Sequence, residues 1–229
     1  MSSFYFRAFT AASMLVAAAL AASPQVKLTV DAADRGPRIG DLHYGIFYEE
    51  INNAGDGGIY AELIRNRSFE DGSLDYWSRK GDCSMAKLTD GLMNPAQGAA
   101  LRLDLKSAGY WGINCVEGDT YTLSFWIAAP DSWNGQATAV LADAQGNIGA
   151  SAVVEAIKAT DKWQKVTASM TATKTIADAR FELTFGKAGT VHLDMVSLFP
   201  PTYKNRPNGC RRDLAEKLEA MKPAFVRFP

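Results

Sequence analysis

Cysteine and histidine are scarce in this chain, which has three cysteines and two histidines among 229 residues. Cys83, Cys115 and Cys210 form no C-x-x-C motif, and His43 and His192 stand alone, so the sequence argues against a zinc site. An odd number of unpatterned cysteines also argues against a disulfide framework. Either a single Cys83–Cys115 bond or three unpaired thiols fits the pattern.

Excess charge of either sign is also missing. The chain has 24 Lys and Arg against 25 Asp and Glu, for a net charge of -1, and no basic block. The sequence therefore gives no sign of a nucleic-acid partner or of an acidic membrane surface. With 47% hydrophobic and 21% charged residues, the composition is that of a globular protein with one large or two modest domains.

Residues 1–22 are predicted to be an export signal. Arg7 supplies a thin positive region, Ala8–Ala22 form an apolar run, and Ala19 with Ala21 gives a small-x-small cleavage pattern. A membrane span needs about 20 strongly apolar residues, whereas this run is alanine-rich. We therefore expect a periplasmic or extracellular protein rather than a membrane-anchored one.

Residues 23–70 are predicted to begin an α/β domain. Val26–Val30 alternates between apolar and polar residues, as a half-buried strand does. Residues 44–48 have the aromatic and branched character of a buried strand. The Asn- and Gly-rich turn that follows leads into a predicted helix with Ile59, Tyr60, Leu63 and Ile64 on one face. We expect this helix to end around residues 66–68.

Residues 71–199 carry the signals of an all-β domain. Six segments alternate or are rich in β-forming residues: Ala99–Leu105, Tyr121–Ile127, Ala137–Ala142, Trp163–Thr171, Ala179–Phe185 and Thr190–Leu198. Turn sequences rich in Gly, Pro, Asn and Asp separate them. Strands at this spacing, with no helix between them, predict an antiparallel β-sandwich of the jelly-roll kind.

Residues 200–229 return to α/β character. A proline-marked connector leads into a helix predicted over about Cys210–Lys222, which Pro223 ends, and residues 224–229 begin another strand. The order is strand, helix, inserted sandwich, helix and strand. Without the insert this is a β-α-β unit, the repeat of a parallel barrel or a doubly wound sheet.

Two sequence blocks and the module between them resemble the amino-terminal part of glycoside hydrolase family 51 α-L-arabinofuranosidases. The blocks are GIFYEEINNAGDGGIYAELIRNRSFE at 45–70 and KNRPNGCRRDLAEKLEAMKPAFVRFP at 204–229, and the module resembles a CenC-type carbohydrate-binding module. The resemblance implies an α/β plus all-β fold, with an incomplete (β/α)8 barrel start and an inserted sandwich. It also implies retaining hydrolysis of terminal arabinofuranosyl residues from arabinose-containing plant polysaccharides or oligosaccharides.

The family's sugar-binding residues carry over where its motifs match. The G-x-F-x-E motif ends at Glu49, which the resemblance makes a ligand of the arabinofuranose hydroxyls, and the V-R-x-P motif contains Arg227, expected to support the catalytic carboxylates. In the family both catalytic glutamates come from later barrel strands, beyond Pro229, so the isolated chain is expected to be inactive. Glu49 and Glu50 cannot readily replace them, because adjacent strand residues point to opposite faces.

Aromatic and acidic residues of the sandwich are candidates for ligand contacts. Tyr110, Trp111 and Trp133 lie near Gly or Pro in expected loops, where their rings could stack on sugars. Trp126, in a strongly alternating strand, is predicted to lie in the core. Asp194 matches a position where such modules bind structural calcium, and no other cofactor is expected.

Two further functions fit the same residues. The sandwich could make the chain a stand-alone carbohydrate-binding protein without catalysis, in which aromatic rings hold the glycan. It could also serve only as a structural spacer between domains. Binding to arabinoxylan or arabinan distinguishes the first from the second.

Overall fold

The computed structural model describes residues 26–71, 74–79, 81, 83–94, 100–102, 105–107, 110, 112–130, 133–155, 157, 158 and 160–228. The chain divides into two compact units, residues 1–41 and 42–229. In the first unit the described residues form neither helix nor strand, and Val26, Leu28 and Val30 have exposed fractions of 92%, 85% and 78%. The predicted strand over Val26–Val30 is therefore wrong, because none of the strands in the described part of the chain pairs with it. The predicted export signal lies outside the described residues.

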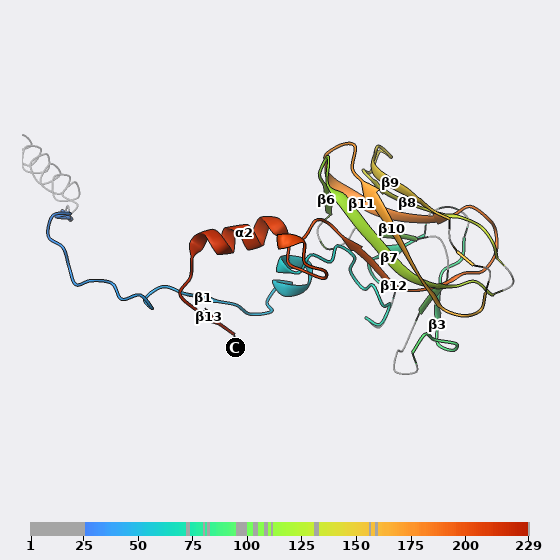
Figure 1. Ribbon diagram of the computed structural model, residues 1–229, viewed down its shortest axis with the longest axis horizontal. Coiled ribbons are helices and arrows are strands. Elements are labelled where there is room, and N and C mark those ends of the chain that lie inside the picture. The colour runs from blue at the N-terminus through green and yellow to red at the C-terminus, as the bar shows by residue number, and fades with distance from the viewer. Residues whose placement is uncertain are drawn as a thin grey trace, which may run out of the picture. The chain divides into compact units, whose positions relative to one another are not determined.

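The second unit contains a parallel pair of short strands, one helix and a β-sandwich (Figure 1). Its strands are β1 (Ile46–Phe47), β2 (Trp77–Ser78), β3 (Ala86–Leu88), β4 (Ala100–Arg102), β5 (Leu105–Ser107), β6 (Ile113–Cys115), β7 (Thr120–Ala128), β8 (Ala137–Ala142), β9 (Ile148–Val154), β10 (Gln164–Thr171), β11 (Ile176–Phe185), β12 (His192–Phe199) and β13 (Val226–Arg227). Its helical elements are the turns η1 (Gly55–Ile59) and η3 (Tyr203–Asn205) and the helix α2 (Arg212–Met221). Among the described residues, no helix combines the length and the apolar character needed to cross a membrane.

The sandwich consists of two antiparallel sheets. One has the strand order β10-β7-β12-β4-β3, and the other has the order β2-β5-β11-β8-β9, with β6 added against β11. Alternation along the strands fills the space between the sheets with apolar side chains. The fully buried members of this core include Tyr121, Leu123, Phe125, Ile127, Leu141, Met170, Phe181, Leu183, Leu193 and Leu198. The predicted antiparallel β-sandwich is confirmed.

β1 and β13 pair in parallel, with Ile46 opposite Val226 and Phe47 opposite Arg227. Because α2 directly precedes β13, the order without the sandwich is β-α-β, as the sequence predicts. α2 agrees with the predicted helix over Cys210–Lys222 apart from its end residues. It ends where Lys222 adopts a left-handed conformation, with a φ of 47°, just before the proline.

The helix predicted over residues 59–64 is wrong. Only the turn η1 forms, in which the N–H groups of Ile59 and Tyr60 donate to carbonyls five residues back. The following residues are drawn into the sandwich instead. The N–H of Leu63 donates to the Leu198 carbonyl at 3.0 Å, and the Arg67 carbonyl accepts from the N–H of Val196 at 3.0 Å. Backbone groups that a helix would need are therefore bonded along β12.

Candidate functional site

The end of β1 carries two carboxylates with different surroundings. Glu49 is half-buried, whereas Glu50 is exposed, and its Oε2 accepts a hydrogen bond of 2.6 Å from the N–H of Gly55. A Cβ at Gly55 would collide with this Oε2 and lie 2.7 Å from the hydroxyl of Tyr48. Glu50 therefore closes the turn after β1, which leaves Glu49 as the carboxylate available to a ligand.

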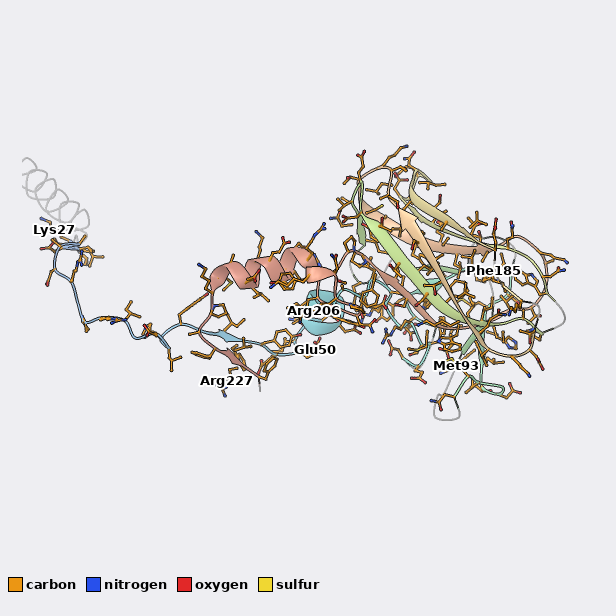
Figure 2. All side chains as sticks on the ribbon, viewed as in Figure 1. Lys27, Glu50, Met93, Phe185, Arg206 and Arg227 are labelled. Carbon is orange, nitrogen blue, oxygen red and sulfur yellow. The ribbon has the colours of Figure 1, made fainter. Side chains whose placement is uncertain are left out.

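Arg227 lies on the strand that pairs with β1. Its guanidinium carbon is 5.3 Å from the centroid of the Phe47 ring, its opposite residue in the parallel register. Residues two positions apart in an extended chain share a side, so Glu49, Phe47 and Arg227 belong to one side of this pair. Figure 2 shows Arg227 on β13 and Glu50 near the turn that follows β1. The sugar-binding roles of Glu49 and Arg227 remain predictions.

Tyr110 reaches from the sandwich to the turn after β1. Its hydroxyl donates a hydrogen bond to the carboxylate of Asp56, and burial together with this bond raises the pKa of Tyr110. Gly57 has a φ of 86°, and a Cβ at this position would collide with the Tyr110 ring. Arg65 stacks nearby, with its guanidinium 3.7 Å from the centroid of the Tyr76 ring and 5.4 Å from that of Tyr110. Tyr110 is thus a half-buried contact to the turn and not a free loop aromatic.

Two tryptophans differ in burial from the prediction: Trp133 is buried, whereas Trp126 lies on the outer face of its sheet. Trp133 is 3% exposed, and its Nε1 donates to the carbonyl of Lys187 at 2.8 Å, so the prediction of a sugar contact at Trp133 is wrong. Trp126 is half-buried and alternates with the inward-facing Phe125 and Ile127, so it lies on the outer face of its sheet and not in the core as predicted. Trp111 lies outside the described residues.

The outer face of β7, β10 and β12 forms a groove of about 570 Å³ that the connector after β12 borders. Hydroxyl-bearing side chains dominate its floor: Thr120, Thr122, Ser124, Thr167 and Ser197. Lys165 also lines the groove and lies opposite Trp126 in the sheet register, and Trp126 lies opposite Asp194 on β12. Arg206 of the connector lines the groove as well (Figure 2). Hydroxyls with an adjacent indole are groups that suit a glycan.

Asp194 is fully buried, and its Oδ1 accepts a hydrogen bond of 2.6 Å from the N–H of Met195. Met195 has a φ of 48° at an irregularity in the pairing of β12 with β7. In the part of the chain that the structure describes, no group of three His, Cys, Asp or Glu residues could hold a metal ion. A calcium ion at Asp194 stays a prediction.

The cysteine geometry removes one of the two alternatives. Cys115 is a buried free thiol whose Sγ lies 3.7 Å from the Lys174 carbonyl, so it is not bonded to Cys83. Burial raises the pKa of this thiol, which keeps it protonated and unreactive.

Glu62 joins the segment after η1 to the sandwich, a role that the sequence did not predict. It is 2% exposed, and its carboxylate accepts hydrogen bonds from the Ser197 hydroxyl at 2.5 Å and from the N–H groups of Leu198 at 2.9 Å and Ile64 at 3.0 Å. Arg67 lies 3.3 Å from the same carboxylate. Burial raises the pKa of Glu62 in spite of these donors. The one sequence signal is a glutamate within an otherwise apolar run.

The connector returning from the sandwich contacts the same region. The N–H of Arg211 donates to the Ile59 carbonyl at 2.7 Å, and Arg212 at the start of α2 lies 3.2 Å from Asp119 of the sandwich. With the Leu63–Leu198 backbone bond, the Arg212–Asp119 ion pair joins the α/β elements to the sandwich.

Comparison with known proteins assigns the sandwich to a protein family. Residues 61–190 match a family described as carbohydrate binding domain. The chain belongs to this family. The match begins within the segment that Glu62 attaches to β12 and ends just before β12.

The carbohydrate binding domain and its flanks also match longer enzymes. The chain is 39% identical over 216 residues to an extracellular exo-α-L-arabinofuranosidase of Streptomyces chartreusis, covering 88% of this chain and 25% of that protein. It is 31% identical to α-L-arabinofuranosidase 1 of Arabidopsis thaliana, covering 90% of this chain and 34% of that protein. A solved family 51 α-L-arabinofuranosidase with bound arabinose superposes with a TM-score of 0.76 at 32% identity, covering 82% of this chain and 34% of that one. The resemblance to this family is confirmed, and the chain spans a quarter to a third of its relatives' length.

Proposed function

We propose that this chain acts in a retaining α-L-arabinofuranosidase that removes terminal α-L-arabinofuranosyl residues from arabinan or arabinoxylan. The observation that carries the proposal is the superposition on the arabinose-bound arabinofuranosidase, with a TM-score of 0.76 over 82% of this chain. That share is larger than residues 61–190 account for, so the likeness extends beyond the carbohydrate binding domain. The extracellular relative supports export through residues 1–22.

In this proposal β1, α2 and β13 are the start of a (β/α)8 barrel. Residues 23–70 and 200–229 belong to the barrel, and residues 71–199 are the inserted module. Large apolar side chains are exposed around the parallel pair: Phe47 (54%), Ile51 (57%), Phe225 (46%), Val226 (47%) and Phe228 (67%). Further strands and helices of a barrel would cover such a surface.

Glu49 and Arg227 then hold the sugar at the catalytic centre. The carboxylate of Glu49 accepts hydrogen bonds from the arabinofuranose hydroxyls, and the cationic Arg227 supports the catalytic carboxylates. Retaining hydrolysis needs two carboxyl groups about 5 Å apart, one as nucleophile and one as acid/base. The Glu50 carboxylate is bound to the Gly55 N–H, so Glu49 and Glu50 are not this pair. As the resemblance implies, the two glutamates come from other barrel strands.

A chimera tests the proposal. Residues 42–229 replace the matching segment of the Streptomyces arabinofuranosidase, and release from 4-nitrophenyl α-L-arabinofuranoside is measured. We expect an active enzyme in which Glu49→Gln lowers kcat/KM at least about tenfold, the loss of one charge-assisted hydrogen bond. Glu117→Gln, on an exposed turn of the sandwich, is the matched control.

Two results of this test would contradict the proposal. A chimera with the parent's circular dichroism and Tm but no activity would argue against the function. An active chimera that Glu49→Gln leaves unchanged would argue against the role of Glu49. The 229-residue chain alone is expected to release no arabinose.

A second candidate function is glycan binding by the sandwich itself. The observation that favours it is the hydroxyl-lined groove on the outer face of β7, β10 and β12, with Trp126 beside it. This function needs no catalytic group, and it is compatible with the first.

A further inference from the structure

A polar hollow of about 230 Å³ lies between the turn after β1 and the sandwich. The turn supplies Asn53 and Asp56, the following segment supplies Arg65 and Asp71, and the sandwich supplies Tyr110. The hollow is therefore built from the α/β elements and the sandwich together. Of the residues that line it, the sequence suggests a ligand contact only for Tyr110.

The walls of the hollow are held in place by contacts among themselves. The Tyr110 hydroxyl donates to Asp56, and the Tyr110 ring packs against Gly57, where any larger residue would collide with it. The Arg65 guanidinium lies 3.7 Å from the centroid of the Tyr76 ring, which fixes the plane of its donors. A ligand would thus meet pre-positioned groups, and little ordering of side chains would accompany binding.

The charges of the hollow favour a neutral ligand. Asp56 and Asp71 balance Arg65 and Arg67, and Arg67 also lies 3.3 Å from the carboxylate of Glu62. This leaves no positive excess for a phosphate, and no metal-binding group of three occurs among the described residues. Carboxylate, amide and guanidinium groups give paired hydrogen bonds, and an aromatic ring beside them suits the face of a sugar. The chemistry matches a neutral sugar ring.

The position of the hollow connects it with the proposed active site. In a (β/α)8 barrel, the loops that follow the strands surround the catalytic centre. Asn53 and Asp56 lie on the loop after β1, the strand that ends at Glu49. The volume is below the about 300–1,000 Å³ of pockets for drug-sized ligands, which leaves room for a single ring.

We propose that the hollow is a subsite for the sugar to which the arabinofuranosyl residue is attached, a xylose or arabinose unit of the polysaccharide. This inference rests on the proposed arabinofuranosidase function. It gives the sandwich a direct part in the substrate cleft, because Tyr110 forms one wall.

NMR titration of the ¹⁵N-labelled 229-residue chain tests the subsite, with α-1,5-arabinotriose and xylotriose as the probes. We expect amide shifts centred on Gly57 and Arg65. Arg65→Met keeps the length of the side chain and its packing on Tyr76 but removes its donors, and it should weaken binding at least about tenfold. Tyr110→Phe should weaken binding several-fold. Arg180→Met on β11 makes the same chemical change away from the hollow and should leave binding unchanged.

Each other outcome overturns the subsite without deciding the proposed function. Binding that is lost in Trp126→Ala or Arg206→Met but kept in Arg65→Met would place the sugar in the groove on the sheet face. If neither oligosaccharide shifts the amide signals up to its solubility limit, the hollow does not bind these sugars and the subsite proposal is wrong. The chimera assay uses an aryl leaving group with no second sugar, so its result stands independently. Tm values equal to that of the natural protein would show that a variant has lost binding without losing its fold.

Discussion

The carboxylate of Glu62 accepts a hydrogen bond of 2.5 Å from the hydroxyl of Ser197, 135 positions later in the chain. The N–H of Leu198 donates to the other oxygen of this carboxylate at 2.9 Å. The N–H of Ala61 donates to the Gly209 carbonyl at 3.2 Å, in the connector that leaves the sandwich. The chain entering the sandwich is therefore bonded both to β12 and to the chain that leaves the sandwich.

Glu62→Gln is expected to remove a pH dependence of stability. Burial raises the pKa of Glu62 above its ordinary value of 4.5, so the folded protein holds this proton more tightly than the unfolded chain. The stabilisation from this group is complete below 4.5 and is lost as the pH rises through the folded pKa. As the pH rises above 4.5, the Tm of the natural protein should fall relative to that of Glu62→Gln. Glu117→Gln, at an exposed position, is the control. A Tm difference between the natural protein and Glu62→Gln that stays the same at every pH would contradict the prediction.

Gly57→Ala is expected to destabilise the protein more than Gly118→Ala. Both glycines have positive φ, 86° and 82°, so both variants carry backbone strain of about 1–3 kcal/mol. A Cβ at Gly118 has open space, whereas one at Gly57 collides with the Tyr110 ring, which should add roughly 1–3 kcal/mol. Urea unfolding measures the loss of unfolding free energy in both variants. Equal losses would mean that the contact between Gly57 and the Tyr110 ring adds no stability.

Trp126→Ala and Trp133→Ala are expected to separate binding from stability. Removing the buried Trp133 ring should cost about 3–5 kcal/mol of unfolding free energy. Trp126 lies half-buried on the outer face, so its removal should cost less and should reduce retardation of the chain in arabinoxylan affinity gels. Unchanged retardation in Trp126→Ala would argue against glycan binding at this face.

Trypsin is expected to cut the first unit before the second. Lys27, Arg35 and Arg38 lie in exposed chain without helix or strand. In contrast, the segment that contains Arg65 is bonded to β12 through the backbone of Leu63 and Arg67. Mass spectrometry of a brief digest should show a resistant fragment that includes Glu62. The sandwich predicted from sequence covers only residues 71–199, so early cleavage after Arg65 or Arg67 would mean that the stable unit has these narrower limits.

The strands with strong alternation were predictable from sequence. β7, β8, β10, β11 and β12 match the expected segments, because apolar residues alternate there and turn residues bound each run. The segment Ala99–Leu105 divides between the sheets, with β4 in one and β5 in the other. A short alternating run does not reveal which sheet it joins.

The wrong sequence predictions share a physical cause. In each case, residues far away in the sequence determine the local structure. Residues 59–64 have a helical pattern, but their backbone bonds to β12 and to the connector replace the helix. Trp133 lies in a loop sequence, yet the Lys187 carbonyl, between β11 and β12, accepts its Nε1 hydrogen, and its ring packs edge-on against Phe185. For Glu49 and Arg227, the strand alternation and the parallel register together place them on one side, and only the structure supplies the register.

The bonded entry and exit of the sandwich also bear on the order of folding. β1 and β13 lie near opposite ends of the unit, and bringing them together through an unfolded chain would carry the loop-closure entropy of everything between them. A sandwich that is already folded, with Glu62 fixed to β12, shortens that loop to residues 48–61 and 200–225. We therefore expect the parallel pair to form after the inserted domain has folded.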